Sequence, residues 1–123
     1  MDDYKLGQVE SLFADIIWTH EPLSSGTLVQ LCQEKLNWKK PTTYTVLRKL
    51  CTRGIFQNVN GVVSSCLSRA EFYARQSEQF VEDTYAGSLP AFIAAFTSRK
   101  SLSQKEVEEI QAMIDSYREK LDG

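Results

Sequence analysis

Residues 39–67 have the sequence KKPTTYTVLRKLCTRGIFQNVNGVVSSCL. In the first half of this segment, side chains suited to a protein interior recur three or four positions apart, which is the spacing of one face of a helix. This predicted inward stripe consists of Thr43, Val46, Leu47 and Leu50. We expect a helix that begins at Thr42 or Thr43 and ends before Gly54, because glycine readily adopts the left-handed conformation found after helix ends.

The second half of the segment predicts a β-hairpin. The dipeptide Asn60-Gly61 lies between two runs rich in β-branched and aromatic residues, 55–59 and 62–67. Asn-Gly suits the tight turn that joins two antiparallel strands, since both residues tolerate a positive φ.

Two further helices are predicted before this segment. The first covers residues 7–20 and ends before Pro22, with one apolar face made of Val9, Leu12, Phe13, Ile16 and Ile17. The second is capped by Ser25 and extends to Asn37, with an inward face of Leu28, Leu31, Cys32 and Leu36. Three helices followed by a hairpin is the order of a winged helix-turn-helix domain, in which the third helix is the recognition helix.

Charge is distributed unevenly along the chain. The formal net charge of −2 disfavours, on average, an association with a phosphate backbone. Residues 35–70, however, contain no acidic residue and hold seven basic ones: Lys35, Lys39, Lys40, Arg48, Lys49, Arg53 and Arg69. Because this stretch includes the predicted recognition helix, it predicts a local surface for nucleic acid.

The outward face of the predicted recognition helix carries side chains suited to a DNA groove. Arg48 can form two hydrogen bonds to a guanine edge, and Thr45 can contact a base edge or a thymine methyl group. The predicted DNA-binding residues are Lys39, Lys40, Thr42, Thr43, Tyr44, Thr45, Arg48, Lys49 and Arg53, of which Thr43 also belongs to the inward stripe. The alternative, and the commoner fate of a charged helix face, is simple exposure to solvent.

Residues 68–123 predict three more helices, with capping signals at Ser68, Ser88 and Ser103. The expected fold is therefore mostly α with a small β-hairpin: a winged-helix domain at 1–67 and a helical dimerisation region at 68–123. Three helices make a small core, so we expect a second copy of the chain to cover their apolar stripes, with packing on the first domain as the alternative. The predicted dimerisation residues are Phe80, Leu89, Phe92, Ile93, Phe96, Val107, Ile110, Ile114 and Tyr117.

Catalytic and metal sites lack their usual parts. His20 is the single histidine, no nucleophile motif accompanies it, and it fits a helix end. Cys32, Cys51 and Cys66 lie too far apart in sequence for a close-spaced metal pair and are interpreted as reduced, half-buried thiols. We expect no enzyme activity, no metal and no cofactor. The chain shows no membrane-length apolar stretch and no signal peptide, so the expected location is the cytoplasm, without membrane insertion.

Four segments together resemble the penicillinase and methicillin-resistance repressors of the BlaI/MecI type. They are Val9-Glu10 through Ile17-Trp18; the stretch Thr42-Thr43-x-Thr45-x-Leu47-x-x-Leu50-x-x-x-Gly54; the run from Phe80 to Phe96 that includes Gly87-Ser88-Leu89; and Leu102-Ser103, which open a final acidic helix. The resemblance implies a homodimer, joined by its C-terminal helices, that binds a palindromic double-stranded DNA operator and blocks transcription. It also implies relief by a membrane sensor-protease that cuts near Ala95-Phe96, and it raises antibiotic resistance as one field of regulation.

The chain departs from this family pattern in two places. Family hairpins usually carry Arg or Lys just after the turn glycine, whereas this chain has Val62-Val63-Ser64-Ser65, which argues against a minor-groove contact. Copper-responsive relatives carry Cys-x-Cys motifs near the C-terminus, whereas all three cysteines here precede Leu67, which argues against copper sensing of that kind. A function from another class stays open: a winged-helix module that binds a protein partner.

Overall fold

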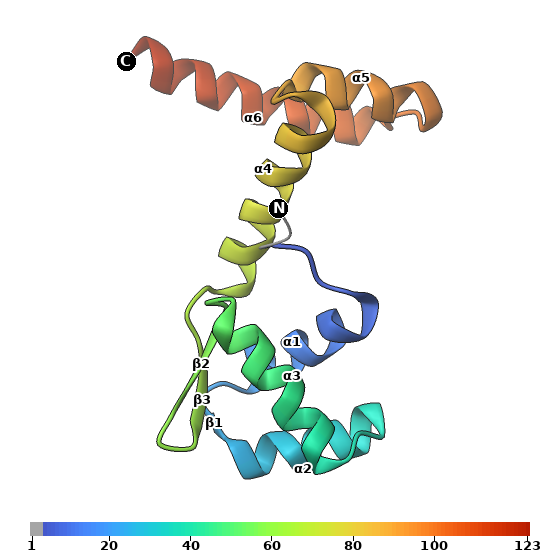
Figure 1. The fold of residues 1–123 in the computed structure, drawn as a ribbon. Coiled ribbons are helices and arrows are strands. Elements are labelled where there is room, and N and C mark those ends of the chain that lie inside the picture. The colour runs from blue at the N-terminus through green and yellow to red at the C-terminus, as the bar shows by residue number, and fades with distance from the viewer. Residues whose placement is uncertain (1–3) are drawn as a thin grey trace. The chain divides into compact units, whose positions relative to one another are not determined.

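The computed structural model describes residues 4–123 and is mainly helical (Figure 1). The elements follow the order α1 (Gln8–His20), β1 (Leu23–Ser24), α2 (Ser25–Leu36), α3 (Lys40–Thr52), β2 (Phe56–Val59), β3 (Val62–Ser65), α4 (Arg69–Tyr85), α5 (Leu89–Arg99) and α6 (Gln104–Asp122). The predicted fold class, a winged helix followed by a helical region, is confirmed. The chain forms two compact units, Met1–Phe80 and Val81–Gly123.

Local chemistry sets the helix ends, with small shifts from the prediction. Ser24, rather than Ser25, caps α2, because its Oγ accepts a hydrogen bond of 3.0 Å from the Thr27 amide. The α3 helix begins at Lys40, two residues before Thr42, since Pro41 is tolerated in a first helical turn, where amides lack intrahelical partners. Gly54 follows α3 with a φ of +80°, as predicted.

The hairpin forms as predicted and is joined by a strand that the sequence did not reveal. Asn60 and Gly61 both have positive φ, 52° and 81°, as a tight hairpin turn requires. β3 pairs with β2 on one side and, through Leu23 and Val63, with the two-residue strand β1 on the other. The Glu21 carboxylate adds a further link, since it accepts hydrogen bonds of 2.8 Å from the amide and the hydroxyl of Ser65.

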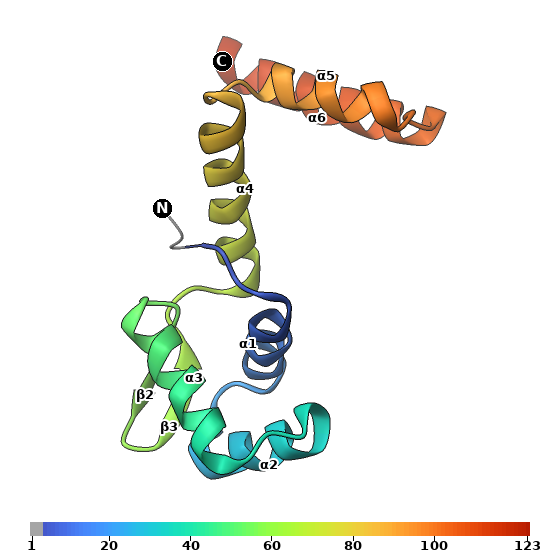
Figure 2. The ribbon, with the colours of Figure 1, turned by 45° about the vertical axis from the view of Figure 1, so that its right-hand side comes forward.

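The core of the first unit lies between its helices and the small sheet (Figure 2). Trp18 of α1 is at its centre: its ring centroid lies 5.3 Å from that of Phe56 and 5.5 Å from that of Phe72, and its Nε1 donates to the Leu67 carbonyl at 2.9 Å. Because Phe72 of α4 is fully buried here, the first unit extends beyond residue 67. The functional division into 1–67 and 68–123 stays a prediction.

The prediction of the apolar face of α1 is wrong for its first two residues. Val9 and Leu12 are 50% and 53% exposed, whereas Ala14 and Trp18 are buried together with Phe13. The buried face is therefore rotated toward Trp18, because the inner turns of α1 meet the hairpin and α4 at this residue.

Tyr4 and Lys5, which precede α1, form hydrogen bonds to α4 and to the end of α3 within the first unit. Gln76 of α4 donates to the Tyr4 carbonyl at 2.7 Å, and Arg75 donates to the Tyr4 hydroxyl at 3.2 Å. One residue further on, the Lys5 carbonyl accepts a hydrogen bond of 2.7 Å from Arg53 at the end of α3.

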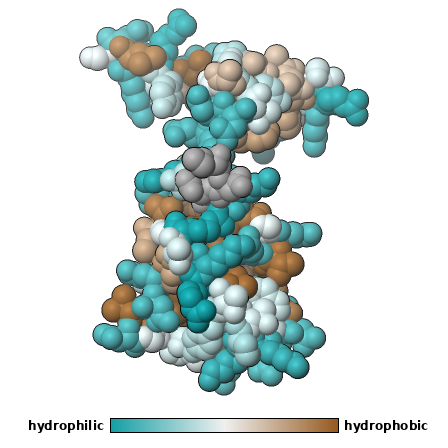
Figure 3. Space-filling view, in the orientation of Figure 1, coloured by the Kyte–Doolittle hydropathy of each residue, from teal (hydrophilic) through white to brown (hydrophobic). Residues whose placement is uncertain are grey.

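The second unit contains the end of α4 together with α5 and α6, which run side by side in both views (Figures 1 and 2). Its caps follow the prediction: Ser88 Oγ accepts from the Ala91 amide, and Ser103 and Glu106 form a reciprocal capping box. None of residues 81–123 is buried. Figure 3 shows apolar side chains at the surface of this unit. Those between 37% and 80% exposed are Leu89, Ile93, Phe96, Val107, Ile110, Met113, Ile114, Tyr117 and Leu121.

Candidate nucleic-acid interface

The outward face of α3 is available to a partner. Thr45 and Arg48 are exposed near the middle of the helix, and Pro41 and Thr42 are exposed at its start. Thr45 Oγ1 donates to the Pro41 carbonyl at 2.9 Å, so its remaining capacity is to accept. Tyr44 is half-buried, and its hydroxyl donates to Ser25 Oγ at 3.0 Å, which fixes the ring beside α2.

The basic residues of the acid-free stretch divide into two groups. Three are engaged within the first unit: Lys49 Nζ lies 2.7 Å from Glu10 Oε2, Arg53 donates to the Lys5 carbonyl, and Arg69 pairs with Asp15. The other four have no ion pair or side-chain hydrogen bond within residues 4–123: Lys35, Lys39, Lys40 and Arg48. The unpaired cations therefore gather at the end of α2, the start of α3 and the middle of its exposed face.

The Lys49 ion pair changes the electrostatics on one flank of α3. The hydrogen bond from Lys49, together with that from the Gly7 amide, holds the pKa of Glu10 below its ordinary value. Glu10 is therefore ionised at neutral pH and offsets the charge of Lys49. A phosphate contact by Lys49 would have to replace its ion pair with Glu10. A phosphate contact by Lys40 would break no such pair, because Lys40 has none within residues 4–123.

Thr43 corrects the predicted set of DNA-binding residues. Its side chain is fully buried, so it contacts the core and not a ligand. Its place in the inward stripe is confirmed, as are those of Leu47 and Leu50, which are buried as well, while Val46 is half-buried.

His20 and the three cysteines are not part of any group of three or more possible metal ligands within residues 4–123. His20 is exposed at the end of α1, where its Nδ1 donates to the Ile16 carbonyl at 2.9 Å, the helix-end role predicted for it. All three cysteines are free, but only Cys51 is half-buried; Cys32 is buried and Cys66 is exposed, so the predicted common environment is wrong. Burial raises the pKa of the Cys32 thiol, which disfavours its reactive thiolate form.

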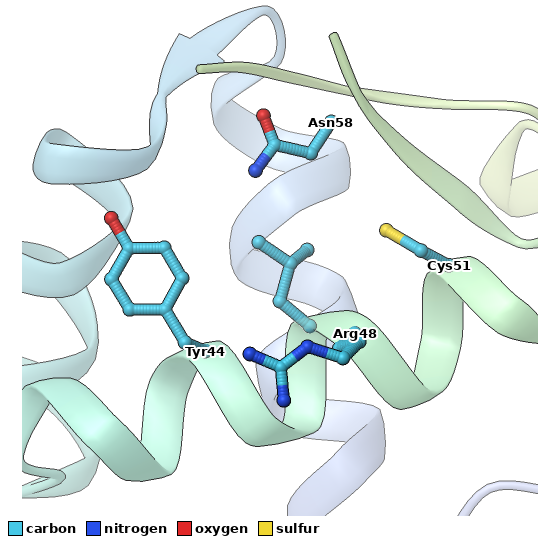
Figure 4. Close-up of a pocket in the computed structure, with 5 residues that line it drawn as sticks. Tyr44, Arg48, Cys51 and Asn58 are labelled. Carbon is cyan, nitrogen blue, oxygen red and sulfur yellow. The ribbon is translucent and has the colours of Figure 1, made fainter. Parts of the chain in front are cut away.

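A pocket of about 230 Å³ lies between α3 and the hairpin, and Figure 4 shows the side chains around it. It is lined by Tyr44, Leu47, Arg48, Cys51 and Asn58. This volume is below the roughly 300–1,000 Å³ of typical small-molecule sites, which argues against an effector pocket. Asn58 was not among the predicted site residues. Successive side chains of a strand point to opposite faces, so Asn58, two positions after the core residue Phe56, shares the face of Phe56. This alternation along β2 is the sequence signal that could have identified Asn58.

The family comparison agrees with this arrangement. A family model described as penicillinase repressor matches residues 6–116. The chain belongs to the penicillinase repressor family. Among curated proteins, the methicillin resistance regulatory protein MecI of Staphylococcus aureus (strain Mu50 / ATCC 700699) is 22% identical over 116 residues, which cover 91% of this chain and 94% of that protein. The MecI proteins of Mammaliicoccus sciuri and Staphylococcus epidermidis give the same identity and coverage.

Membership of the penicillinase repressor family confirms the resemblance found in the sequence. It identifies the chain as a transcriptional repressor and, as predicted, not as an enzyme. Within residues 4–123, no helix combines the length and the apolar character needed to span a membrane.

Proposed function

We propose that this repressor is a cytoplasmic homodimer that recognises a palindromic operator by placing α3 in the major groove. The observation that carries the proposal is Arg48, an exposed arginine without an intramolecular partner at the middle of the outward face of α3. Arginine in this position can form two hydrogen bonds to a guanine, the commonest base-specific contact in DNA complexes.

The neighbouring side chains fit complementary roles. Thr45 is placed to accept a hydrogen bond at a base edge, while the unpaired Lys39 and Lys40 at the start of α3 suit phosphates. Thr42 and Tyr44 lie beside these residues on α3 and belong to the same proposed DNA-binding set. Lys49 and Arg53 complete the proposed set on the opposite flank of α3, where they already hold Glu10 and the Lys5 carbonyl, so we expect smaller contributions from them.

Dimerisation is supported by the unpartnered apolar surface of the second unit. Removing such side chains from water stabilises an assembly by about 25 cal/mol for each Å² of apolar surface buried, and here no side chain of the unit is buried within one chain. The stripe of α6 consists of Val107, Ile110, Ile114 and Tyr117, and that of α5 of Leu89, Ile93 and Phe96. Phe92 is half-buried against Tyr85 and Phe96, and Phe80 is 48% exposed at the end of the first unit. A two-fold dimer presents two copies of α3 to two half-sites.

The test is binding to duplex DNA at several salt concentrations. If several phosphates are neutralised, the logarithm of the binding constant falls steeply and linearly with the logarithm of the salt concentration. A selected operator and a scrambled duplex of the same composition separate specific from non-specific binding. A protein-binding winged helix, the competing function, would show neither operator preference nor this steep salt dependence.

Relief of repression by a sensor-protease forms the second part of the proposal. Ala95 and Phe96 lie inside α5, a helix of 11 residues with no buried side chain, so local opening at this position costs little. A cut here separates α6 from the rest of the chain and removes its stripe from the proposed dimer surface. The name of the MecI relatives supports antibiotic resistance as the regulated process.

Mass spectrometry of the chain recovered from induced and uninduced cells tests this second part. We expect a fragment ending at Ala95 only after induction. Intact chain in induced cells with repression lifted would contradict cleavage and point to another mechanism of relief.

A further inference from the structure

The hairpin places one amide opposite the recognition helix. Asn58 pairs with Val63 across the sheet and shares a strand face with Phe56. The side chains of Val63 and Phe56 are both buried. Asn58 itself is exposed, and its side chain has no hydrogen bond within residues 4–123. In Figure 4 its amide lies across the pocket from Tyr44 and Arg48 of α3.

The residues around this pocket divide into donors and apolar atoms. Of the two exposed members, Arg48 is assigned to a guanine edge in the proposed function, which leaves the Asn58 amide as the donor for a further ligand. The covered members are Leu47, Cys51 and the Tyr44 ring, which the hydrogen bond to Ser25 holds in place. No acidic residue lines the pocket, so an anion would meet no opposing charge there.

A phosphodiester linked to deoxyribose has the same division of properties, with anionic oxygens that accept hydrogen bonds and a largely apolar sugar. A sugar-phosphate strand bounds each side of the major groove, so a recognition helix in the groove has a strand on either flank. The pocket lies on the flank of α3 that faces the hairpin, where it can meet one of these strands.

We propose that the pocket between α3 and β2 receives one phosphodiester-deoxyribose unit of the operator backbone, held by the Asn58 amide. The inference rests on the proposed function and adds a DNA contact from the hairpin. It explains how a hairpin without a basic residue takes part in binding: a neutral amide contacts the backbone without releasing counterions. Since a phosphate contact carries no base information, Asn58 contributes to affinity and to the register of the protein on DNA, and not to base selection.

The test compares two isosteric changes on adjacent residues of β2. Asn58→Asp puts a carboxylate where the phosphate would lie. Gln57→Glu adds the same charge on the opposite face of the strand, where Gln57 Nε2 contacts Ser64 Oγ at 3.1 Å. Affinities for operator and scrambled duplexes are measured with the full chain at several salt concentrations, and circular dichroism confirms that each variant is folded.

We expect Asn58→Asp to weaken binding to both duplexes alike, by about tenfold to a hundredfold for each protomer that contacts the DNA, as for the loss of a hydrogen bond to a charged group. Gln57→Glu should stay within about threefold of the wild type, and Asn58→Ala should give a smaller uniform loss than Asn58→Asp. If Asn58→Asp proves unfolded, the uniform loss in Asn58→Ala decides the matter.

Wild-type affinity in both Asn58 variants, in a protein that shows operator preference and steep salt dependence, would overturn this inference and leave the proposed function standing. A loss confined to the operator would also overturn it, because Asn58 would then contact a base. Absence of salt-dependent DNA binding by the wild type would instead contradict the proposed function itself.

Discussion

Arg48→Ala tests whether α3 recognises bases. Arg48 is exposed and has no intramolecular partner, so its removal should change the free energy of unfolding by less than about 0.5 kcal/mol. A bidentate contact to guanine is worth about 1–3 kcal/mol of discrimination, and a dimer on a two-fold operator loses it twice. The expected loss of operator preference is therefore about 2–6 kcal/mol, or roughly thirtyfold to more than ten-thousandfold in affinity ratio.

Mobility-shift titrations on operator and scrambled duplexes at several salt concentrations measure this loss. Lys40→Ala is the matched control, since Lys40 is also exposed, unpaired and basic but lies at the start of α3. It should weaken binding to both duplexes alike and lower the salt slope by about 1 for each phosphate that is no longer neutralised. If Arg48→Ala kept the full operator preference, α3 would not be recognising bases, and the protein-binding alternative would gain support.

Three further predictions concern assembly and stability. Ile114→Asp should convert the dimer to a monomer in sedimentation at micromolar concentration, while Ala112→Asp, on the opposite face of α6, should not; a folded, dimeric Ile114→Asp protein would exclude this stripe as the interface. Glu10→Gln should lower the free energy of unfolding at pH 7. Because Lys49 lowers the pKa of Glu10, the difference in the free energy of unfolding between variant and wild type, measured by urea denaturation, should shrink as the pH falls below 4.5; a difference independent of pH would contradict the role of this pair. Phe72→Ala should lower the free energy of unfolding of the first unit by about 3–5 kcal/mol, measured by thermal unfolding; if the unit ended at residue 67, this free energy would hardly change.

Signals confined to neighbouring residues made the larger part of the fold predictable. The Asn60-Gly61 turn, the left-handed Gly54 and the Ser103 capping box each depend on a few adjacent residues, and the structure has all three. β1 escaped prediction because two residues carry no periodicity: Leu23 and Ser24 are a strand only through their pairing with β3.

The candidate site was predictable in composition and not in its contacts. The acid-free stretch identified the basic residues, but only the folded chain brings Glu10 to Lys49 across 39 positions of sequence, and Lys5 to Arg53 across 48. Val9 and Leu12 matched the helical period yet lie outside the core, since periodicity gives the spacing of a face and not its exact direction. Asn58 is uncharged, so the uneven charge distribution that predicted the basic residues could not reveal it.

The placement of the two tryptophans provides an optical label for one half of the molecule. Trp18 packs against Phe56 and Phe72, and Trp38 stacks on Phe13 with ring centroids 5.4 Å apart, so both indoles belong to the first unit and the second has none. Intrinsic tryptophan emission therefore follows the melting of the winged helix alone, whereas far-ultraviolet circular dichroism follows the helices of both units. Comparing the two signals during one temperature scan would resolve the order in which the halves unfold, without any attached dye.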